Sequence, residues 1–428
     1  MSSTQDRDPY PDALRACALL VVVLGHWIAT LPRLEDGQLV ATDHLLAVWG
    51  SAGFLTWLVQ VVPLFVFVSA AVSADSVEKR LREGAQRQWW ALRALGMARP
   101  TVTYLAVLTL LALVSLAMGT RLLGLFNTSL TVHLWFLLML LTVQAMLPWC
   151  LRMDRRFGLG AVAGLVLVAM SLDGVRGGVS SFADLRWLGD RVSSASPGMA
   201  WLNMLVVWLV PQQLGIAWKR GRFRGVQAGL ALLALGAAWL VLALGSGYPV
   251  AMVGVALAGN NMLPPTLALV GVMWLQAGAV LVFEPLARTL LAGRVLGRAV
   301  AILGALGMPL YLWHKLAELP AAWLGEKLGL PIDAGVPGEA GFWLGRLAWI
   351  VLCMLMVAPV IAAVVAFELR RVREVPAMAD WKAVSLGGIA LYAGLAMALA
   401  WGAWPGAVAG LACVAFASWR LRLRGGNG

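Results

Sequence analysis

The sequence predicts an all-α protein, a polytopic bundle of transmembrane helices. Hydrophobic residues make up 61% of the 428 positions, charged residues make up 13%, and the mean hydropathy is +0.82, which lies far from the balance of a soluble domain. Apolar runs of roughly 20 residues, the length that crosses a bilayer, recur along the chain. Basic residues gather at alternate ends of successive runs. A separate globular domain of ordinary size therefore has no room between them.

The order of the apolar runs predicts the organisation of the chain. We expect about ten core spans in residues 1–375, followed by a two-helix hairpin and a basic cytoplasmic tail in residues 376–428. The expected spans are 13–31, 46–74, 100–118, 131–150, 158–171, 201–218, 225–245, 266–283, 300–318, 342–368, 383–400 and 404–419.

The cations predict the orientation. Most of the 33 Lys and Arg residues fall in segments that share one side of the membrane when the amino terminus is cytoplasmic. The positive-inside rule therefore places both termini in the cytoplasm of a multi-pass protein of the plasma (inner) membrane. Topology explains the net charge of +12 without a nucleic-acid partner. The 4 cysteines lack the paired spacing of a disulfide framework or a zinc site, and no metal is expected.

The first span carries two ionisable residues on one face. Arg15 lies at its entrance and His26 lies deep inside it, eleven positions further on, which is about three helical turns or roughly 16 Å along the axis. Burial of such groups in lipid costs several kcal/mol unless they face a bundle interior or a wet cavity. We therefore expect Arg15 and His26 to be functional.

Prolines occur in or next to the second and third spans. Pro63 and Ser69 are expected to bend the second span or to hydrogen-bond within it. An ordinary kinked helix explains them at least as well as a direct role for Ser69. Pro100 is expected to begin the third span, since proline is tolerated at a helix entrance.

A basic segment separates these two spans and includes Arg82, Arg93 and Arg99. Topology explains most of its arginines. They also share a membrane side with Arg15, and guanidinium groups bind phosphates bidentately. An anion site on the cytoplasmic side is therefore a second interpretation.

Polar groups recur near the external ends of later spans. His133 and Trp135 begin the fourth span, where a Trp is usually an interfacial anchor. In the ninth span Tyr311, His314 and Glu318 follow at spacings of three and four, which places them on one helix face. All 4 histidines map to the outer half of the membrane or to outer loops, whereas most arginines map to the inner side. We expect an anionic ligand held from the cytoplasm and acid/base chemistry further out.

Several of these segments resemble the acyltransferase-3 family of membrane acyltransferases. RDPYPDALRACALLVVVLGHW is similar to the family's opening helix, and PLFVFVSA is similar to its second span. ALRALGMARP is similar to a basic run that ends in Arg-Pro, HLWF to a fourth-span element and PLYLWH to a late Tyr-x-x-His ending. The likeness covers roughly residues 7–373 in the family's order. Ala70 replaces the usual glycine after Ser69, and Gly307-Met308 stand where Ser-Tyr is common.

The resemblance implies transfer of an acyl group, commonly acetyl from acetyl-CoA, to a hydroxyl of an envelope glycan, a lipid-linked sugar or a similar acceptor. The phosphates of acyl-CoA would be held at the inner face by Arg82, Arg93 and Arg99, together with Arg15. His26 would act as general base on the acceptor hydroxyl or would accept the acyl group covalently.

The acceptor would contact His133, Trp135, Tyr311 and His314.

A transporter or flippase for an anionic or sugar-linked substrate is the competing interpretation, because the same arginine and histidine, Arg15 and His26, can line a substrate or proton pathway. The halves of the chain show no convincing internal repeat and no matched pair of broken helices, which argues against transport. No P-loop or dinucleotide fingerprint is found, which removes most ATP-driven functions.

Overall fold

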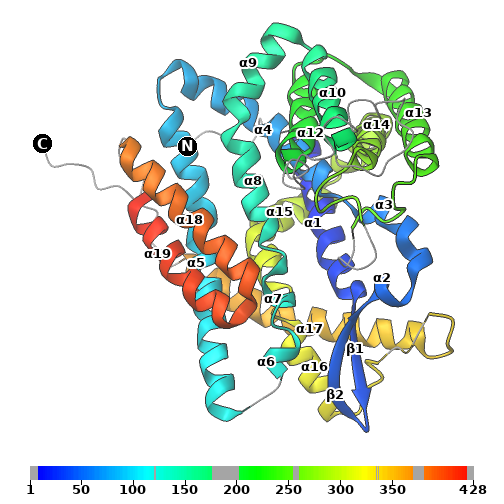
Figure 1. Cartoon of the computed structure of the whole chain (residues 1–428), viewed down its shortest axis with the longest axis vertical. Helices are drawn as coiled ribbons and strands as arrows, with labels where there is room; N and C mark the ends of the chain where they lie inside the picture. Colours follow the sequence, from blue (N-terminus) through cyan, green and yellow to red (C-terminus); the bar gives the residue numbers. More distant parts are fainter. Residues whose placement is uncertain are drawn as a thin grey trace, which may run out of the picture. The chain divides into compact units, whose positions relative to one another are not determined.

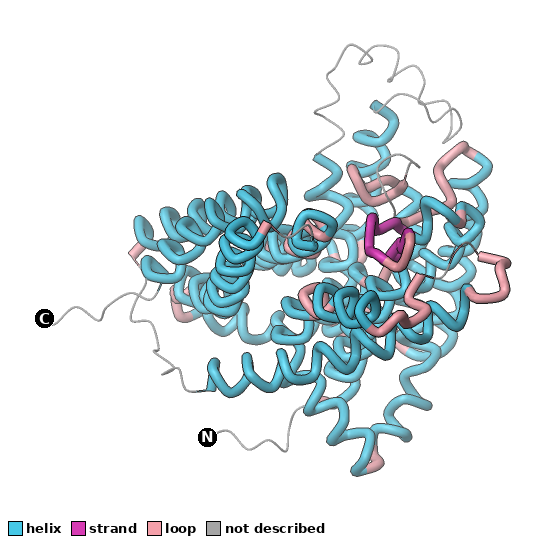
Figure 2. Tube along the Cα trace, turned by 90° about the horizontal axis from the view of Figure 1, so that it is seen from below, coloured by secondary structure: helices cyan, strands magenta, loops and turns pink. Residues whose placement is uncertain are grey.

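Helices make up almost all of the computed structural model, which describes residues 8–119, 122–175, 202–253, 260–333, 335, 337–369 and 380–421. Within these ranges the one sheet is a two-stranded antiparallel hairpin, drawn in magenta in Figure 2. The predicted all-α, multi-pass bundle is confirmed. The junction near residue 375 and the tail beyond 421 lie outside the described residues, so the division into a core domain and an added hairpin stays a prediction.

The chain forms two compact units whose segments alternate along the sequence. The first unit contains residues 1–22, 50–79 and 142–305, and the second contains residues 23–49, 80–141 and 306–428. Helices that continue from one unit into the other are α1 (Pro9–Ala29), α4 (Val62–Arg82), α8 (Trp135–Ala145) and α15 (Arg294–Trp313).

The first unit is held together by closely packed helices. A Cβ atom on Gly236 of α13 would lie 2.8 Å from the carbonyl oxygen of Gly271 on α14, and one on Gly278 would lie 2.7 Å from that of Gly229. Only glycine allows two helix backbones to approach this closely. The elements that lie wholly in this unit are η2 (Gly50–Leu55), α3 (Thr56–Val59), α9 (Leu147–Phe157), α10 (Gly160–Val175), α12 (Asn203–Lys219), α13 (Gly225–Gly245) and α14 (Leu267–Leu291).

In the second unit the carboxy-terminal helices α18 and α19 form a hairpin that packs beside α5 (Figure 1). The backbone amide of Trp404 donates to Asn127 Oδ1 at 2.8 Å, which ties the hairpin bend to the segment before α7. The elements of this unit are β1 (Thr30–Glu35), β2 (Gln38–His44), α2 (Leu45–Val48), α5 (Gln86–Met118), α6 (Leu122–Leu125), α7 (Ser129–Val132), α16 (Glu318–Lys327), α17 (Phe342–Leu369), α18 (Trp381–Trp401), η5 (Gly402–Gly406) and α19 (Ala407–Leu421).

The candidate membrane spans are fewer than the sequence predicts. In the described part of the chain 8 helices are long and apolar enough to cross a bilayer, or 9 if the bent pair Ser129–Ala145 and Leu147–Phe157 forms one span. The predicted fifth and sixth spans are helices α10 and α12 of 16 and 17 residues, and the hairpin of α18 and α19 is counted as one segment. The number of spans therefore stays a prediction.

Two prolines have different outcomes. The candidate span Gly50–Arg82 is interrupted directly before Pro63, which occupies the first turn of α4, because helix α3 ends at Val59 and α4 begins at Val62. Pro100 does not begin a helix, since α5 already starts at Gln86 and runs through it. A proline in the first turn loses no hydrogen bond, whereas one inside a helix removes the bond to the carbonyl four residues earlier.

The hairpin of β1 and β2 is fixed at both ends. Asp36 and Gly37 form its turn with positive φ angles of 50° and 76°, the conformation that a two-residue hairpin needs. Arg33 donates to Asp43 at 2.7 Å and to Asp333 at 3.2 Å. Partial burial alone would raise the pKa of the Asp333 carboxyl, but two backbone N–H donors and the Arg33 guanidinium hold this pKa below its ordinary value of 3.8.

Candidate active site

His26, His133 and His314 come together in the second unit from segments far apart in the sequence. His26 lies in the last turn of α1, His133 lies between α7 and α8, and His314 directly follows α15. His26 Nδ1 is 2.8 Å from His314 Nε2, and the two rings stack with centroids 5.1 Å apart. The ring of His133 meets that of His314 edge-on at 5.4 Å. The three histidines form one cluster.

One pattern of protonation satisfies the two stacked rings. His314 Nδ1 is 2.8 Å from the backbone carbonyl oxygen of Tyr311, and a carbonyl only accepts, so this nitrogen carries a hydrogen. In a neutral His314 the Nε2 atom is then an acceptor, and His26 Nδ1 must donate to it. His26 Nε2 keeps its lone pair, and no described residue donates to it. That atom is ready to accept a proton.

Buried groups fix the end of α1 relative to His314. Trp27 Nε1 donates to the carbonyl of His314 at 3.0 Å, and Trp349 Nε1 donates to the carbonyl of Trp27 at 3.0 Å. Arg346 donates to the carbonyl of Thr30 at 2.6 Å. Each donor side chain is buried. Since buried hydrogen bonds are strong when well directed, the rings of His26 and His314 are held by the same set of contacts.

The chain after His314 corrects one prediction. Tyr311, His314 and Glu318 do not share the face of one continuous helix, because α15 ends at Trp313 and α16 begins at Glu318. From Trp313 to Glu318 the backbone hydrogen bonds join residues only three positions apart. The amide of Glu318, for example, donates to the carbonyl of Lys315 at 3.2 Å. Side chains three apart are aligned in so tight a turn.

Lys315 and Glu318 consequently form a buried ion pair. Lys315 Nζ is 2.6 Å from Glu318 Oε1, with side-chain exposures of only 4% and 0%. Lys315 also donates to Thr30 Oγ1 at 3.0 Å. The Thr30 hydroxyl lies 3.2 Å from Glu318 Oε1 and 3.1 Å from the carbonyl oxygen of His26, and it donates to one of them at a time. The ion pair is thereby connected to the backbone of His26.

His133 lies in a cage of aromatic rings. Tyr104 and Tyr311 meet its ring edge-on at 5.5 Å each, and the residue is 1% exposed. The Tyr311 hydroxyl donates to the backbone carbonyl of His133, so it holds the turn between α7 and α8. Trp135 follows at the first position of α8. The predicted acceptor contacts of these residues stay predictions.

The arginines expected to bind phosphate lie elsewhere. Arg82 ends α4 and is exposed, whereas Arg93 and Arg99 are half-buried on α5. The Arg93 guanidinium stacks over the ring of Trp89 at 5.6 Å. The structure assigns all three to the second unit, and phosphate binding stays a prediction.

Arg15 belongs to the first unit. Its guanidinium is 3.7 Å from the Asp12 carboxylate and 5.7 Å from the ring centroid of Phe65. It shares the unbroken helix α1 with His26, as the sequence predicts. The aromatic contact and the carboxylate leave the guanidinium about one-third exposed.

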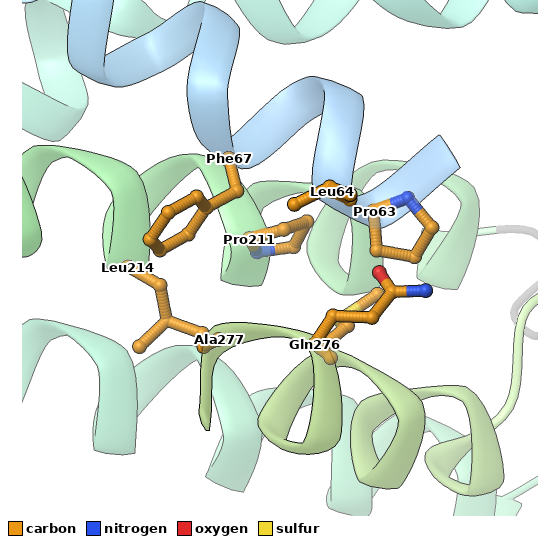
Figure 3. Close-up of a pocket in the computed structure, with 8 residues that line it drawn as sticks. Pro63, Leu64, Phe67, Pro211, Leu214, Gln276 and Ala277 are labelled. Carbon is orange, nitrogen blue, oxygen red and sulfur yellow. The ribbon is translucent and has the colours of Figure 1, made fainter. Parts of the chain in front are cut away.

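The first unit also contains a narrow apolar crevice (Figure 3). Its one polar side chain, Gln276, donates to the backbone carbonyl of Gln60 at 2.6 Å. No charged or nucleophilic side chain lines it, so we assign it no chemistry. Its lining residues are Pro63, Leu64, Phe67, Pro211, Leu214, Met273, Gln276 and Ala277.

Sequence reasoning missed several residues of the cluster. Lys315 stands directly after His314, and Arg346 stands inside an apolar run, so the general rule for ionisable residues in such runs could have found both. Thr30 and Tyr104 carry no comparable signal, because a hydroxyl in an apolar segment is common.

Comparison with known proteins gives one match. The family model described as an acyltransferase domain matches residues 8–368, which is most of the chain. No curated protein and no solved structure matches it.

Proposed function

Because the chain belongs to the acyltransferase-3 family, and is therefore a membrane acyltransferase, we propose that it uses cytoplasmic acyl-CoA, with acetyl as the acyl group. The acceptor is a hydroxyl of an envelope glycan, a glycolipid or a similar molecule. The protein lies in the inner membrane with both termini in the cytoplasm.

The observation that supports this chemistry is the chain of contacts from the Tyr311 carbonyl through His314 to His26. An acyl acceptor that is a hydroxyl must lose its proton as it attacks, and a neutral imidazole is the commonest base for that step. A base that is itself oriented by a second group is the arrangement found in activated nucleophile sites generally. Here His314 orients the ring and fixes the tautomer that leaves His26 Nε2 as the base.

The reaction then follows from the free lone pair. His26 Nε2 takes the proton of the acceptor hydroxyl, whose oxygen attacks the thioester carbonyl carbon. When the C–S bond breaks, the same nitrogen returns the proton to the departing CoA thiolate. Trp27 and Trp349, both buried beside the cluster, exclude water, which strengthens the electrostatics of the site and limits hydrolysis of the thioester.

The donor is proposed to bind through its phosphates to Arg82, Arg93 and Arg99, with Arg15 further along α1. Arginine suits this task because its planar group binds phosphate bidentately and keeps its charge. The separation of Arg15 and His26, roughly 16 Å along one helix, is comparable with the length of a pantetheine arm.

Label transfer tests the function. Purified protein in nanodiscs is incubated with radiolabelled acetyl-CoA and a crude envelope extract. We expect the wild type to transfer label, and His26→Ala and Arg15→Ala to transfer at least about 100-fold less. The matched control is His44→Ala, because this histidine accepts only from the amide of Leu46 (3.2 Å) and caps the short helix α2. Undiminished transfer by His26→Ala would contradict the mechanism.

CoA affinity tests the phosphate site separately. Arg99→Ala is expected to weaken the binding of CoA by about 10- to 100-fold, because a charge-assisted hydrogen bond contributes roughly 1.5–3 kcal/mol. Arg87→Ala is the control, since this arginine lies on the same helix α5 and is exposed. Equal dissociation constants for Arg99→Ala and the wild type would remove Arg99 from the donor site.

A further inference from the structure

His133 is a buried polar side chain without a well-directed hydrogen bond. It is 1% exposed, and within the described ranges neither ring nitrogen has a partner of good geometry. The backbone of Leu312 comes close to the ring, but neither nitrogen makes a directed hydrogen bond with it. A buried polar group left in this state destabilises the fold, so its persistence requires an explanation.

The surrounding protein holds His133 firmly despite this cost. The Tyr104 hydroxyl donates to the carbonyl of Leu130 at 2.5 Å, and the Tyr311 hydroxyl donates to that of His133 itself. Two buried tyrosines thus fix the backbone within α7 and directly after it, and their rings pack edge-on against the imidazole. The position of the ring is determined, while its nitrogens make no directed hydrogen bond among the described residues.

The neighbour of His133 is the ring that orients the base. His314 contacts both His26, at 2.8 Å between ring nitrogens, and the edge of His133, at 5.4 Å between centroids. A neutral imidazole donates one hydrogen bond, and a donor beside the general base is suited to the negative charge that develops during acyl transfer.

We infer that His133 is a catalytic residue that donates a hydrogen bond to the carbonyl oxygen of the acyl donor. The inference rests on the proposed function and adds to it the group that stabilises the oxyanion. When the acceptor oxygen bonds to the carbonyl carbon, the C=O electron pair moves to oxygen, and His133 N–H donates to that oxygen. As the C–S bond breaks, the pair returns to the carbonyl, and His26 gives its proton to the thiolate.

Two substitutions at His133 separate donation from packing. His133→Phe keeps an aromatic ring and removes the donor, and His133→Gln keeps an N–H donor without a titrating ring. We expect His133→Phe to lower kcat by about 10²- to 10³-fold, the usual effect of removing one oxyanion donor, with KM for acetyl-CoA unchanged. His133→Gln is expected to recover at least tenfold of this loss, with the pH profile of the wild type.

Trp313→Phe is the matched control. Trp313 Nε1 is also buried and has no partner among the described residues, and its ring packs on the same Tyr104 at 5.3 Å. We expect its kcat to stay within threefold of the wild type. An equal loss in His133→Phe and Trp313→Phe would mean that the cage matters only for packing and would overturn the inference. An equal loss in His133→Phe and His133→Gln would also overturn the inference. It would mean that His133 acts as a base, because glutamine can replace a hydrogen-bond donor but not a base.

A bound ketone provides a readout that does not depend on turnover. Acetonyl-dethia-CoA, in which a methylene group replaces the thioester sulfur, is labelled with ¹³C at its carbonyl and bound to each variant. We expect the carbonyl stretching frequency to be lower in the wild type and in His133→Gln than in His133→Phe. The same frequency in all three would refute the hydrogen bond even if acyl transfer is observed. A wild type that neither transfers label nor binds this analogue refutes the proposed function and the inference with it.

Discussion

The ion pair of Lys315 and Glu318 gives the sharpest test of how the cluster is built. Both side chains are almost completely buried, and their charged atoms are 2.6 Å apart. Lys315→Met removes the cation at nearly constant length and leaves the Glu318 carboxylate with two neutral hydroxyls, that of Thr30 at 3.2 Å and that of Ser129. Removing one member of a buried pair costs about 3–5 kcal/mol, because the other charge stays out of water.

A double variant and a control variant decide whether that cost comes from the unpaired charge. In the double variant Lys315→Met with Glu318→Leu no buried charge remains, so we expect most of the lost stability to return. Lys327→Met is the control, because Lys327 ends helix α16, the helix that begins at Glu318. Lys327 Nζ is 3.6 Å from Glu326, and its side chain is 60% exposed, so its loss is expected to cost less than about 1 kcal/mol.

The assay is the free energy of unfolding from a denaturant titration in mixed micelles. We expect the order Lys327→Met, then the double variant, then Lys315→Met as the least stable. A cost below about 1 kcal/mol for Lys315→Met, equal to that of the exposed control, would show that the pair is solvated and would refute the reasoning. A double variant as unstable as the single one would show that Lys315 acts through packing instead.

Two further predictions concern the hairpin and the base. The pKa of Asp333 is held below its ordinary value of 3.8 in the folded protein. Its contacts therefore stabilise the hairpin at pH values above 3.8, and this contribution is lost as the pH falls through the lowered pKa. Asp333→Asn should therefore reduce amide protection of β1 and β2 at neutral pH by hydrogen exchange, and the difference from the wild type should shrink in acid. His314→Gln keeps an acceptor for His26 Nδ1 and should retain about a tenth of kcat, whereas His314→Phe should lose about 10²- to 10⁴-fold in label transfer, and equal losses would contradict the orienting role.

The class of protein could be predicted from sequence, and Arg15 and His26 could be selected as candidates, because the signals are local. Hydropathy alone predicts the helical bundle, and the helical period predicts that Arg15 and His26 share a face of α1. The contact of His26 with His314 joins residues 288 positions apart, and no periodicity reports it. Resemblance named both residues, with His314 in acceptor binding or orientation, but it did not predict the hydrogen bond between the two rings.

Other differences arise where two local rules compete. Asp36-Gly37 is a strong turn signal between apolar residues, but a search for long apolar runs passes over a strand hairpin between spans. Pro100 follows a basic run and so resembles a helix start, yet α5 begins 14 residues earlier at Gln86. In such a long helix the remaining hydrogen bonds outweigh the one that proline removes.

The orienting contacts also bear on whether the acyl group passes through the protein. In direct transfer His26 Nε2 holds the proton briefly while Nδ1 continues to donate to His314, so the relay is unchanged. An acyl group on Nε2 would instead leave a cationic ring until Nδ1 lost its proton, and the atom bonded to Nδ1 is His314 Nε2. His314 donates its one hydrogen to a backbone carbonyl, not to a carboxylate, so neither contact of the His314 ring balances the resulting charge. The nearby carboxylate of Glu318 is already paired with Lys315. The contacts therefore favour direct transfer, in which the charge on His26 lasts only until the thiolate leaves.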